Sequence, residues 1–174
     1  MEVNKREKVL FSREEINERV KKLGKEISEI YKEKNLVVVS LLRGSFIFCA
    51  DLVREMDIPV EVDFITTHSY GHGEISTGNV DIVHDLRTDL KGKDVLIVDD
   101  IMDSGHTIKK VREHLQEKNP ESVNICVMLD KPDRRQVELD PDYIGFSIPD
   151  LFIVGYGLNY GDHYRNIPYI FTFE

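Results

Sequence analysis

Residues 95–107 constrain the fold more strongly than any other part of the chain. Residues 95–98 are a continuous apolar run, which is typical of a parallel strand buried on both faces. Asp99 and Asp100 follow directly. Because charged groups are costly inside a buried strand, we expect them to mark the strand's end. Residues 103–107 are a turn with Ser, Gly and Thr, and a helical pattern follows. The segment therefore predicts a strand, a turn and a helix of an α/β sheet.

The same turn has the composition of a binding site. Ligands of open α/β sheets bind at the carboxyl ends of the strands. A Gly/Ser/Thr turn that opens a helix offers backbone N–H groups to a phosphate. Paired carboxylates suit ribose hydroxyls and Mg²⁺. A sugar phosphate is the ligand class that accounts for both the acids and the turn.

Composition narrows the class of protein. The chain has 174 residues, enough for one domain with a sizeable core. Its net charge of −9 argues against a nucleic-acid partner and against an anionic membrane surface. No apolar run approaches the ~20 residues of a membrane span, and we expect no signal peptide. Cys49 and Cys126 lie in apolar stretches and are expected to be small buried hydrophobes. A cytoplasmic location fits these features.

Periodicity predicts an alternation of strands and helices. Ser12 and Glu15 form a capping box ahead of an amphipathic helix that we expect to end near Asn35. Residues 68–79 are a long polar, glycine-rich loop, and such loops are usually functional lids. Strands are expected at 36–42, 60–67, 79–86, 95–98, 123–129, 143–148 and 151–154, and further helices at 45–56 and 108–118.

These elements predict one domain over residues 1–174. We expect an α/β core of about residues 10–130, with a mainly parallel twisted sheet flanked by helices. Residues 131–174, together with the N-terminal residues, are expected to form a small irregular hood.

The segment 95–107 resembles the 5-phosphoribosyl-1-pyrophosphate (PRPP) motif of the type I phosphoribosyltransferases. That pattern is four apolar residues, two acids, two apolar residues and Asp-Ser/Thr-Gly-x-Thr, and the match is complete. Other short motifs follow the order found in the hypoxanthine(-guanine) phosphoribosyltransferases of that family, in their short bacterial form. They are Leu42-Arg43-Gly44, Ser69-Tyr70-Gly71, Asp130-Lys131-Pro132, residues 145–150, residues 152–157 and Tyr164-Arg165.

The resemblance implies an activity in purine salvage. Such enzymes transfer the 5-phosphoribosyl group of PRPP to N9 of a 6-oxopurine, with Mg²⁺, and release pyrophosphate with IMP or GMP. They are homodimers or homotetramers. Three alternatives stay open: a transferase for xanthine or a pyrimidine, a PRPP-sensing regulator that binds RNA, and a phosphate-binding flavodoxin-like module without catalysis.

The resemblance also assigns the residues around the phosphoribosyl group. Asp99 and Asp100 match the acidic pair that takes the ribose hydroxyls and Mg²⁺. Asp103 matches the carboxylate near purine N7, a candidate general base or acid, although a helix N-cap is an alternative role. The residues expected around the 5′-phosphate are Ser104, Gly105, His106 (through its backbone N–H) and Thr107.

Further residues are assigned to the base, the pyrophosphate and the lid. Lys131 is expected to donate to the purine 6-oxo group, because an ammonium pairs with a carbonyl and not with an amino group. Phe152 would stack on the purine, with a core aromatic as its alternative role, and Ile153 would present backbone groups to the base. The pyrophosphate residues are Arg43, Gly44 and Arg165 (for which a surface arginine is the alternative), and the lid tip is Ser69 and Tyr70.

One residue departs from the family's pattern. Asn159 stands where the family has an Asp that ligates the second Mg²⁺. An Asn offers a carbonyl oxygen without the charge that hard cations prefer. We therefore expect weaker binding of the second metal ion.

Overall fold

The computed structural model describes residues 5–69 and 79–174. Its centre is a six-stranded sheet in the order β4-β3-β2-β5-β6-β7, in which only the β3–β4 pair is antiparallel. The mainly parallel α/β sheet expected from the sequence is confirmed. Its strands are β2 (Leu36–Leu42), β3 (Glu61–Ser69), β4 (Val80–His84), β5 (Asp94–Met102), β6 (Ser122–Asp130) and β7 (Tyr143–Ser147).

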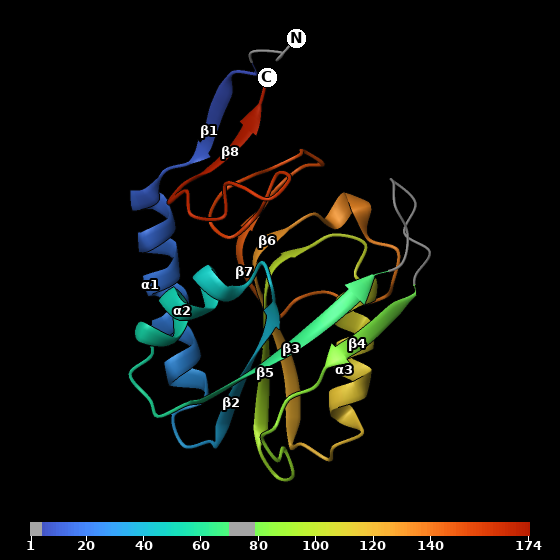
Figure 1. Cartoon of the computed structure of the whole chain (residues 1–174). Coiled ribbons are helices and arrows are strands. Elements are labelled where there is room, and N and C mark those ends of the chain that lie inside the picture. The colour runs from blue at the N-terminus through green and yellow to red at the C-terminus, as the bar shows by residue number, and fades with distance from the viewer. Residues whose placement is uncertain (1–4, 70–78) are drawn as a thin grey trace.

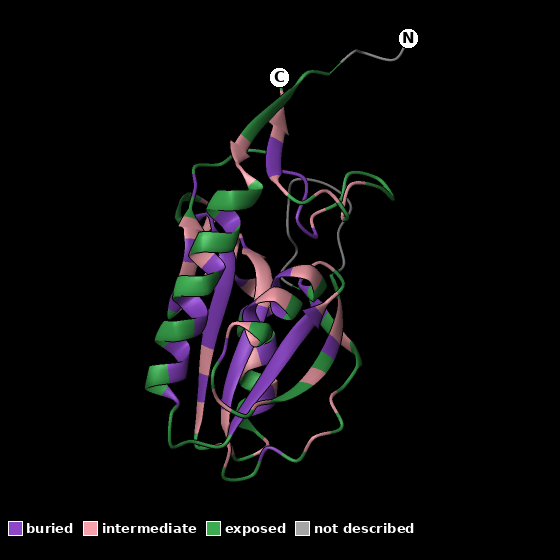
Figure 2. Ribbon diagram, turned by 90° about the vertical axis from the view of Figure 1, so that its left-hand side faces the viewer, coloured by how far each residue is buried: buried purple, intermediate pink, exposed green. Residues whose placement is uncertain are grey.

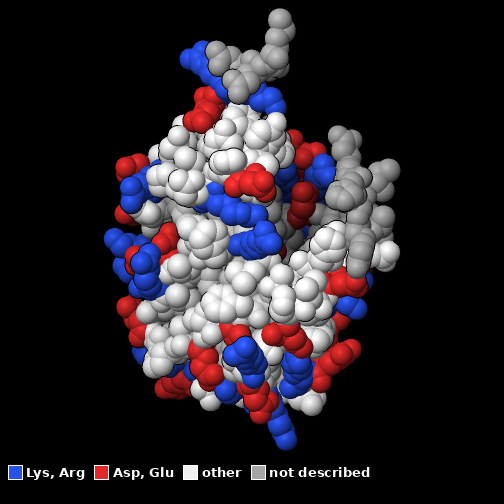
Figure 3. All heavy atoms as spheres, in the orientation of Figure 1, with Lys and Arg blue, Asp and Glu red and all other residues white. Residues whose placement is uncertain are grey.

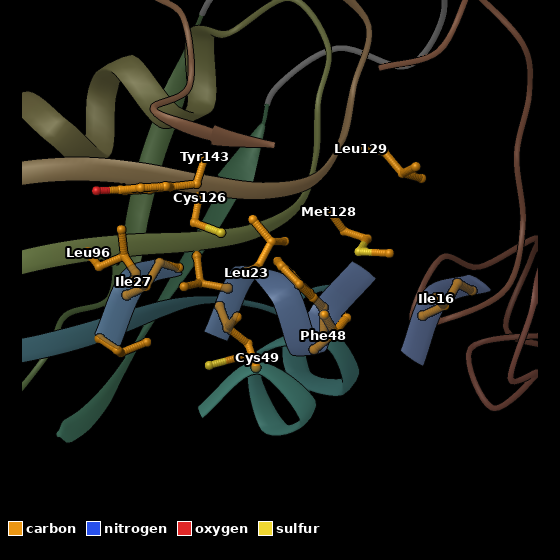
Figure 4. Close-up of a cluster of buried hydrophobic side chains, with 14 of the residues drawn as sticks. Ile16, Leu23, Ile27, Phe48, Cys49, Leu96, Cys126, Met128, Leu129 and Tyr143 are labelled. Carbon is orange, nitrogen blue, oxygen red and sulfur yellow. The ribbon is translucent and has the colours of Figure 1, made fainter. Parts of the chain in front are cut away.

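Helices cover both faces of this sheet (Figure 1). Helices α1 (Arg13–Ile30) and α2 (Phe46–Arg54) lie on one face, and α3 (His106–Gln116) lies on the other. Figure 4 shows side chains of α1, α2 and the strands meeting in the first of two apolar clusters. The burial pattern in Figure 2 follows the same layers, with the central strands buried along most of their length. Cys49 and Cys126 are free and buried, as expected.

A second sheet joins the two ends of the chain. Strand β1 (Glu7–Phe11) pairs antiparallel with β8 (Ile170–Phe173), and Figure 1 shows the pair beyond the end of the main sheet. The sequence analysis missed both strands. Because each forms its ladder only with a segment about 160 residues away, local periodicity carries little sign of it. The loops between β7 and β8 lie over the carboxyl ends of the parallel strands (Figure 1).

Several expected boundaries were wrong. Strand β5 does not end at Asp99 but continues to Met102, because its backbone keeps pairing with β6 while both carboxylates stay partly exposed. Residues 151–154 are not a strand, since only Val154 makes an isolated bridge, to Phe171. The first helix ends at Ile30, because residues 32–35 are exposed and have no apolar contact to hold another turn.

Smaller shifts affect the ends of other elements. Helix α2 is shorter than the expected 45–56, and α3 begins at His106 rather than residue 108. The strand expected at 79–86 is β4, which is shorter and pairs antiparallel with β3. Within the described ranges, no helix combines the length and apolarity that a membrane span requires.

Candidate active site

Asp99 and Asp100 lie near the carboxyl end of β5, partly buried. Burial raises the pKa of Asp99 well above its usual value, and the negative charge of Asp100 raises it further. Burial also raises the pKa of Asp100, while hydrogen bonds and the positive charge of Arg165 oppose that rise. Two poorly solvated carboxylates side by side are unfavourable when both are ionised. The pair therefore suits a bound cation or a hydroxyl-rich ligand.

The turn after β5 opens directly into α3. It lines a cavity of about 250 Å³ together with the acidic pair. Gly105 takes a left-handed conformation with φ 91°, and a Cβ there would overlap the Val137 side chain. The first N–H groups of a helix have no intrahelical acceptors, and that of His106 donates instead to Ser104 Oγ at 3.5 Å. Gly105 and Thr107, at the start of α3, line the cavity.

Asp103 is not the helix N-cap that was its alternative role. Gly105 occupies the N-cap position, and no side chain caps the helix. One carboxylate oxygen of Asp103, Oδ1, is enclosed and has no hydrogen-bond partner among the described residues. The Nε atom of Arg134 lies 3.0 Å from that oxygen, without the geometry of a hydrogen bond. Asp103 therefore keeps acceptor capacity next to the turn.

The end of β3 reaches the same turn. The hydroxyl oxygen of Ser69 lies 3.5 Å from that of Thr107, across two elements far apart in sequence. The expected lid tip at Tyr70 lies outside the described residues. The His106 ring is occupied elsewhere, with Nε2 2.8 Å from Gln136 Oε1.

The segments expected at the pyrophosphate also come together. A Cβ at Gly44 would overlap a carboxylate oxygen of Asp100, and a Cβ at Gly157 would overlap the Gly44 carbonyl. Arg165 donates from Nη1 to the Gly157 carbonyl at 2.6 Å, so it is not simply a surface arginine. The peptide bond between Leu42 and Arg43 is cis. Backbone, carboxylate and guanidinium thus meet at one edge of the site.

On the purine side, Lys131 is buried, with 7 % of its surface exposed. Its Nζ lies 3.6 Å from Asp150 Oδ1, and its backbone N–H bonds to the Met102 carbonyl at the end of β5. Phe152 is 58 % exposed, so its alternative role as a core aromatic is wrong. The Phe152 ring contacts Tyr160 edge-on at 5.7 Å between centroids. Ile153 is buried beside it.

The donor set for a metal ion is incomplete in the protein alone. No group of three or more His, Cys, Asp or Glu suited to a metal occurs in the described part of the chain. Asn159 is exposed and donates from Nδ2 to the Gly161 carbonyl at 2.7 Å. Mg²⁺ commonly binds through one or two carboxylates and otherwise through water and phosphate oxygens. The acidic pair fits that mode of binding.

A larger cavity, of about 630 Å³, lies between α1, α2 and residues 165–168. Arg165 lines this cavity, but the turn 103–107 does not. Volume alone does not identify the site, because the buried acidic pair and the helix donors lie at the smaller cavity.

Comparison with known proteins agrees with this geometry. Residues 11–161 match the model of the phosphoribosyl transferase domain. The chain belongs to the phosphoribosyl transferase family. It is 52% identical over 164 residues to the hypoxanthine phosphoribosyltransferase of Salmonella typhimurium, covering 93% of this chain and 92% of that relative. It is 48% identical over 171 residues to the hypoxanthine-guanine phosphoribosyltransferase of Aquifex aeolicus, covering 98% and 96%.

Solved structures of the family have the same fold. The crystal structure of a hypoxanthine phosphoribosyltransferase from Staphylococcus aureus superposes with a TM-score of 0.92 at 42% identity, covering 96% of this chain and 91% of that one. A ternary substrates complex of a mutant hypoxanthine phosphoribosyltransferase from Trypanosoma cruzi gives a TM-score of 0.89 at 38% identity, with 98% and 95% covered. The predicted family and fold class are confirmed.

The sequence analysis missed two charged residues that the structure brings to the site. Arg134 and Asp150 link Asp103 to Lys131 through ion pairs. The only local signal was the basic composition of residues 131–135. Arg134 pairs with Asp103 at the site, whereas the neighbouring Arg135 pairs with Asp130. The sequence of that run does not distinguish the two arginines.

Proposed function

We propose that this chain is an enzyme of purine salvage that transfers the 5-phosphoribosyl group of PRPP to N9 of hypoxanthine, and of guanine. The products are IMP or GMP and pyrophosphate. One observation carries the proposal: the partly buried acidic pair, the donor-rich turn and Lys131 gather around the end of β5. The named relatives are hypoxanthine and hypoxanthine-guanine phosphoribosyltransferases.

The turn at the start of α3 holds the 5′-phosphate in this proposal. Backbone N–H groups of residues 104–107 and the hydroxyls of Ser104 and Thr107 donate to the phosphate oxygens. Asp99 and Asp100 accept hydrogen bonds from the ribose hydroxyls. Arg165 and the backbone at Arg43 and Gly44 face the pyrophosphate. Ser69 and Tyr70 belong to the lid that excludes water, which would otherwise hydrolyse PRPP.

Mg²⁺ is the proposed cofactor, held by Asp99 and Asp100, with Asn159 as the ligand of a second ion. When bound, Mg²⁺ neutralises charge on the leaving pyrophosphate. Burial disfavours the ionised form of the acidic pair, and a bound cation would favour it. Asn159 contributes only a neutral oxygen.

The base is recognised by its 6-oxo group. The buried ammonium of Lys131 donates to that oxygen and pairs with no exocyclic amino group, which selects against adenine. Phe152 stacks on the purine from its exposed position, and Ile153 offers backbone groups to the edge of the base. Asp103 accepts the proton of N7 as N9 bonds to C1′ of the ribose and the bond from C1′ to pyrophosphate breaks.

Charge distribution supports catalysis over RNA binding. Acidic and basic side chains are mixed on the face shown in Figure 3, and the described residues of that face form no continuous basic surface. The formal net charge is −9. RNA binding relies on clustered Lys and Arg that neutralise phosphates.

The test is a spectrophotometric assay of the purified chain with PRPP, Mg²⁺ and one free base at a time. We expect turnover with hypoxanthine and guanine and none with adenine or a pyrimidine. Turnover of xanthine alone would show that the enzyme is a xanthine phosphoribosyltransferase and would refute the proposed specificity. Absence of turnover with every base, in a folded protein that still binds PRPP, would refute the enzymatic proposal.

Three further properties belong to the same proposal. The whole chain acts as one phosphoribosyltransferase domain, with a core of about residues 10–130 and a hood of residues 131–174. The enzyme is a cytoplasmic homodimer or homotetramer. Light scattering after gel filtration tests the assembly, because the mass of one chain is 20.2 kDa.

A further inference from the structure

An alternating row of charges crosses the base side of the site. Arg134 Nε lies 3.0 Å from Asp103 Oδ1, and Arg134 Nη1 lies 3.3 Å from Asp150 Oδ2. The other oxygen of Asp150, Oδ1, lies 3.6 Å from Lys131 Nζ. The row therefore runs from Asp103, the proposed proton carrier, through Arg134 and Asp150 to Lys131. Lys131 is the proposed donor to the 6-oxo group.

The geometry of Arg134 explains why an arginine occupies this position. A guanidinium is a planar fork that can meet two carboxylates at once, whereas an ammonium is a single point charge. The backbone of Arg134 is fixed, because its N–H donates to the Lys131 carbonyl at 3.1 Å and closes a short 3₁₀ turn, η1 (Pro132–Arg134). The two cations of the row are thus anchored in a single turn.

The two ends of this row are enclosed, whereas Arg134 and Asp150 between them are partly exposed. The Lys131 side chain is only 8% exposed, and it forms an ion pair with Asp150. The enclosed Oδ1 of Asp103 has a charge contact with Arg134 but no hydrogen bond among the described residues. Such an oxygen can turn away from a base unless a neighbouring charge holds it, and small misplacements of a reacting group are costly to the rate.

We propose that Arg134 is a positioning residue that orients the carboxylate of Asp103 and, through Asp150, the ammonium of Lys131. It does so without touching the substrate. This inference rests on the proposed function, because it assigns Arg134 a part in the same transfer.

The experiment measures kcat and both KM values with PRPP and hypoxanthine for the wild type, Arg134→Met and Arg134→Lys. We expect Arg134→Met to lose about tenfold in kcat and to keep the KM for PRPP within about twofold. Arg134→Lys should recover part of the loss, because an ammonium restores one of the two contacts. An unchanged kcat in Arg134→Met, or a loss carried wholly by the KM for PRPP, would overturn the inference.

A double-mutant cycle with Asp150→Asn tests the row itself. Residues joined in one ion-pair network give non-additive effects, so the double variant should lose less than the product of the two single losses. Additive effects would contradict the network. Arg54→Met is the matched control, since Arg54 pairs with Asp51 on α2 and should keep wild-type kinetics. Inactivity of the wild type would refute the proposed function, whereas an active wild type with a neutral Arg134→Met would refute only this inference.

Discussion

At the scale of single residues, Asp103 is the proton carrier that we propose. Its enclosed oxygen retains acceptor capacity, and it lies in the turn that lines the cavity. We predict that Asp103→Asn lowers kcat by on the order of 10²–10⁴-fold, the range that general acid–base catalysis supplies. The rate of IMP formation measures this, with Asp133→Asn on the exposed side of η1 as control. A loss of threefold or less would remove Asp103 from the proton transfer.

Asn159 tests the contribution of charge to the second metal site. An Asp there supplies the negative charge that Asn lacks, and hard cations prefer charged oxygen ligands. We predict that Asn159→Asp reaches half-maximal rate at a lower Mg²⁺ concentration than the wild type. Titration of the rate against Mg²⁺ compares the two, with Asn166→Asp as control. Superimposable curves for all three proteins would reject a role for position 159 in metal binding.

At the scale of elements, the start of α1 is fixed by a reciprocal pair of hydrogen bonds. Ser12 Oγ accepts from the Glu15 N–H at 3.1 Å, and Glu15 Oε1 accepts from the Ser12 N–H at 3.2 Å. We predict that Ser12→Ala lowers the free energy of unfolding by about 1 kcal/mol and leaves kcat unchanged. Urea denaturation measures the free energy of unfolding. The control is Glu18→Ala, at an exposed position of the same helix. Equal stability of the two variants would contradict the capping role.

Elements with strong local signals were predictable from the sequence. The capping box, the buried strand β2 and the turn after β5 are each determined by neighbouring residues, and the structure has all three. The β1–β8 pair and the ion pairs of Arg134 depend on segments that meet only after folding. The end of β5 was misplaced because backbone pairing with β6 continues past the two carboxylates.

At the scale of the whole molecule, we expect the acidic pair to lower stability at neutral pH. The pKa of Asp99 is raised in the folded state, so its contribution to stability is complete below the unfolded pKa and is lost as pH rises through the folded pKa. We predict that Asp99→Asn, which stays neutral, has a higher Tm than the wild type at pH 7.5.

The difference in Tm between Asp99→Asn and the wild type depends on pH. The gap in Tm should shrink as pH falls towards 4, because the wild-type carboxyl then becomes neutral as well. Thermal unfolding in the absence of metal and substrate measures the difference in Tm at pH 7.5 and at pH 4. A variant less stable than the wild type at pH 7.5 would show that the ionised pair does not destabilise the fold.

The most direct measurement of the central claim is a crystal structure of this chain with bound IMP. We predict that the 5′-phosphate lies in the turn of residues 103–107, the ribose hydroxyls on Asp99 and Asp100, and the base between Phe152 and Lys131. A nucleotide bound elsewhere, with that turn empty, would contradict the account.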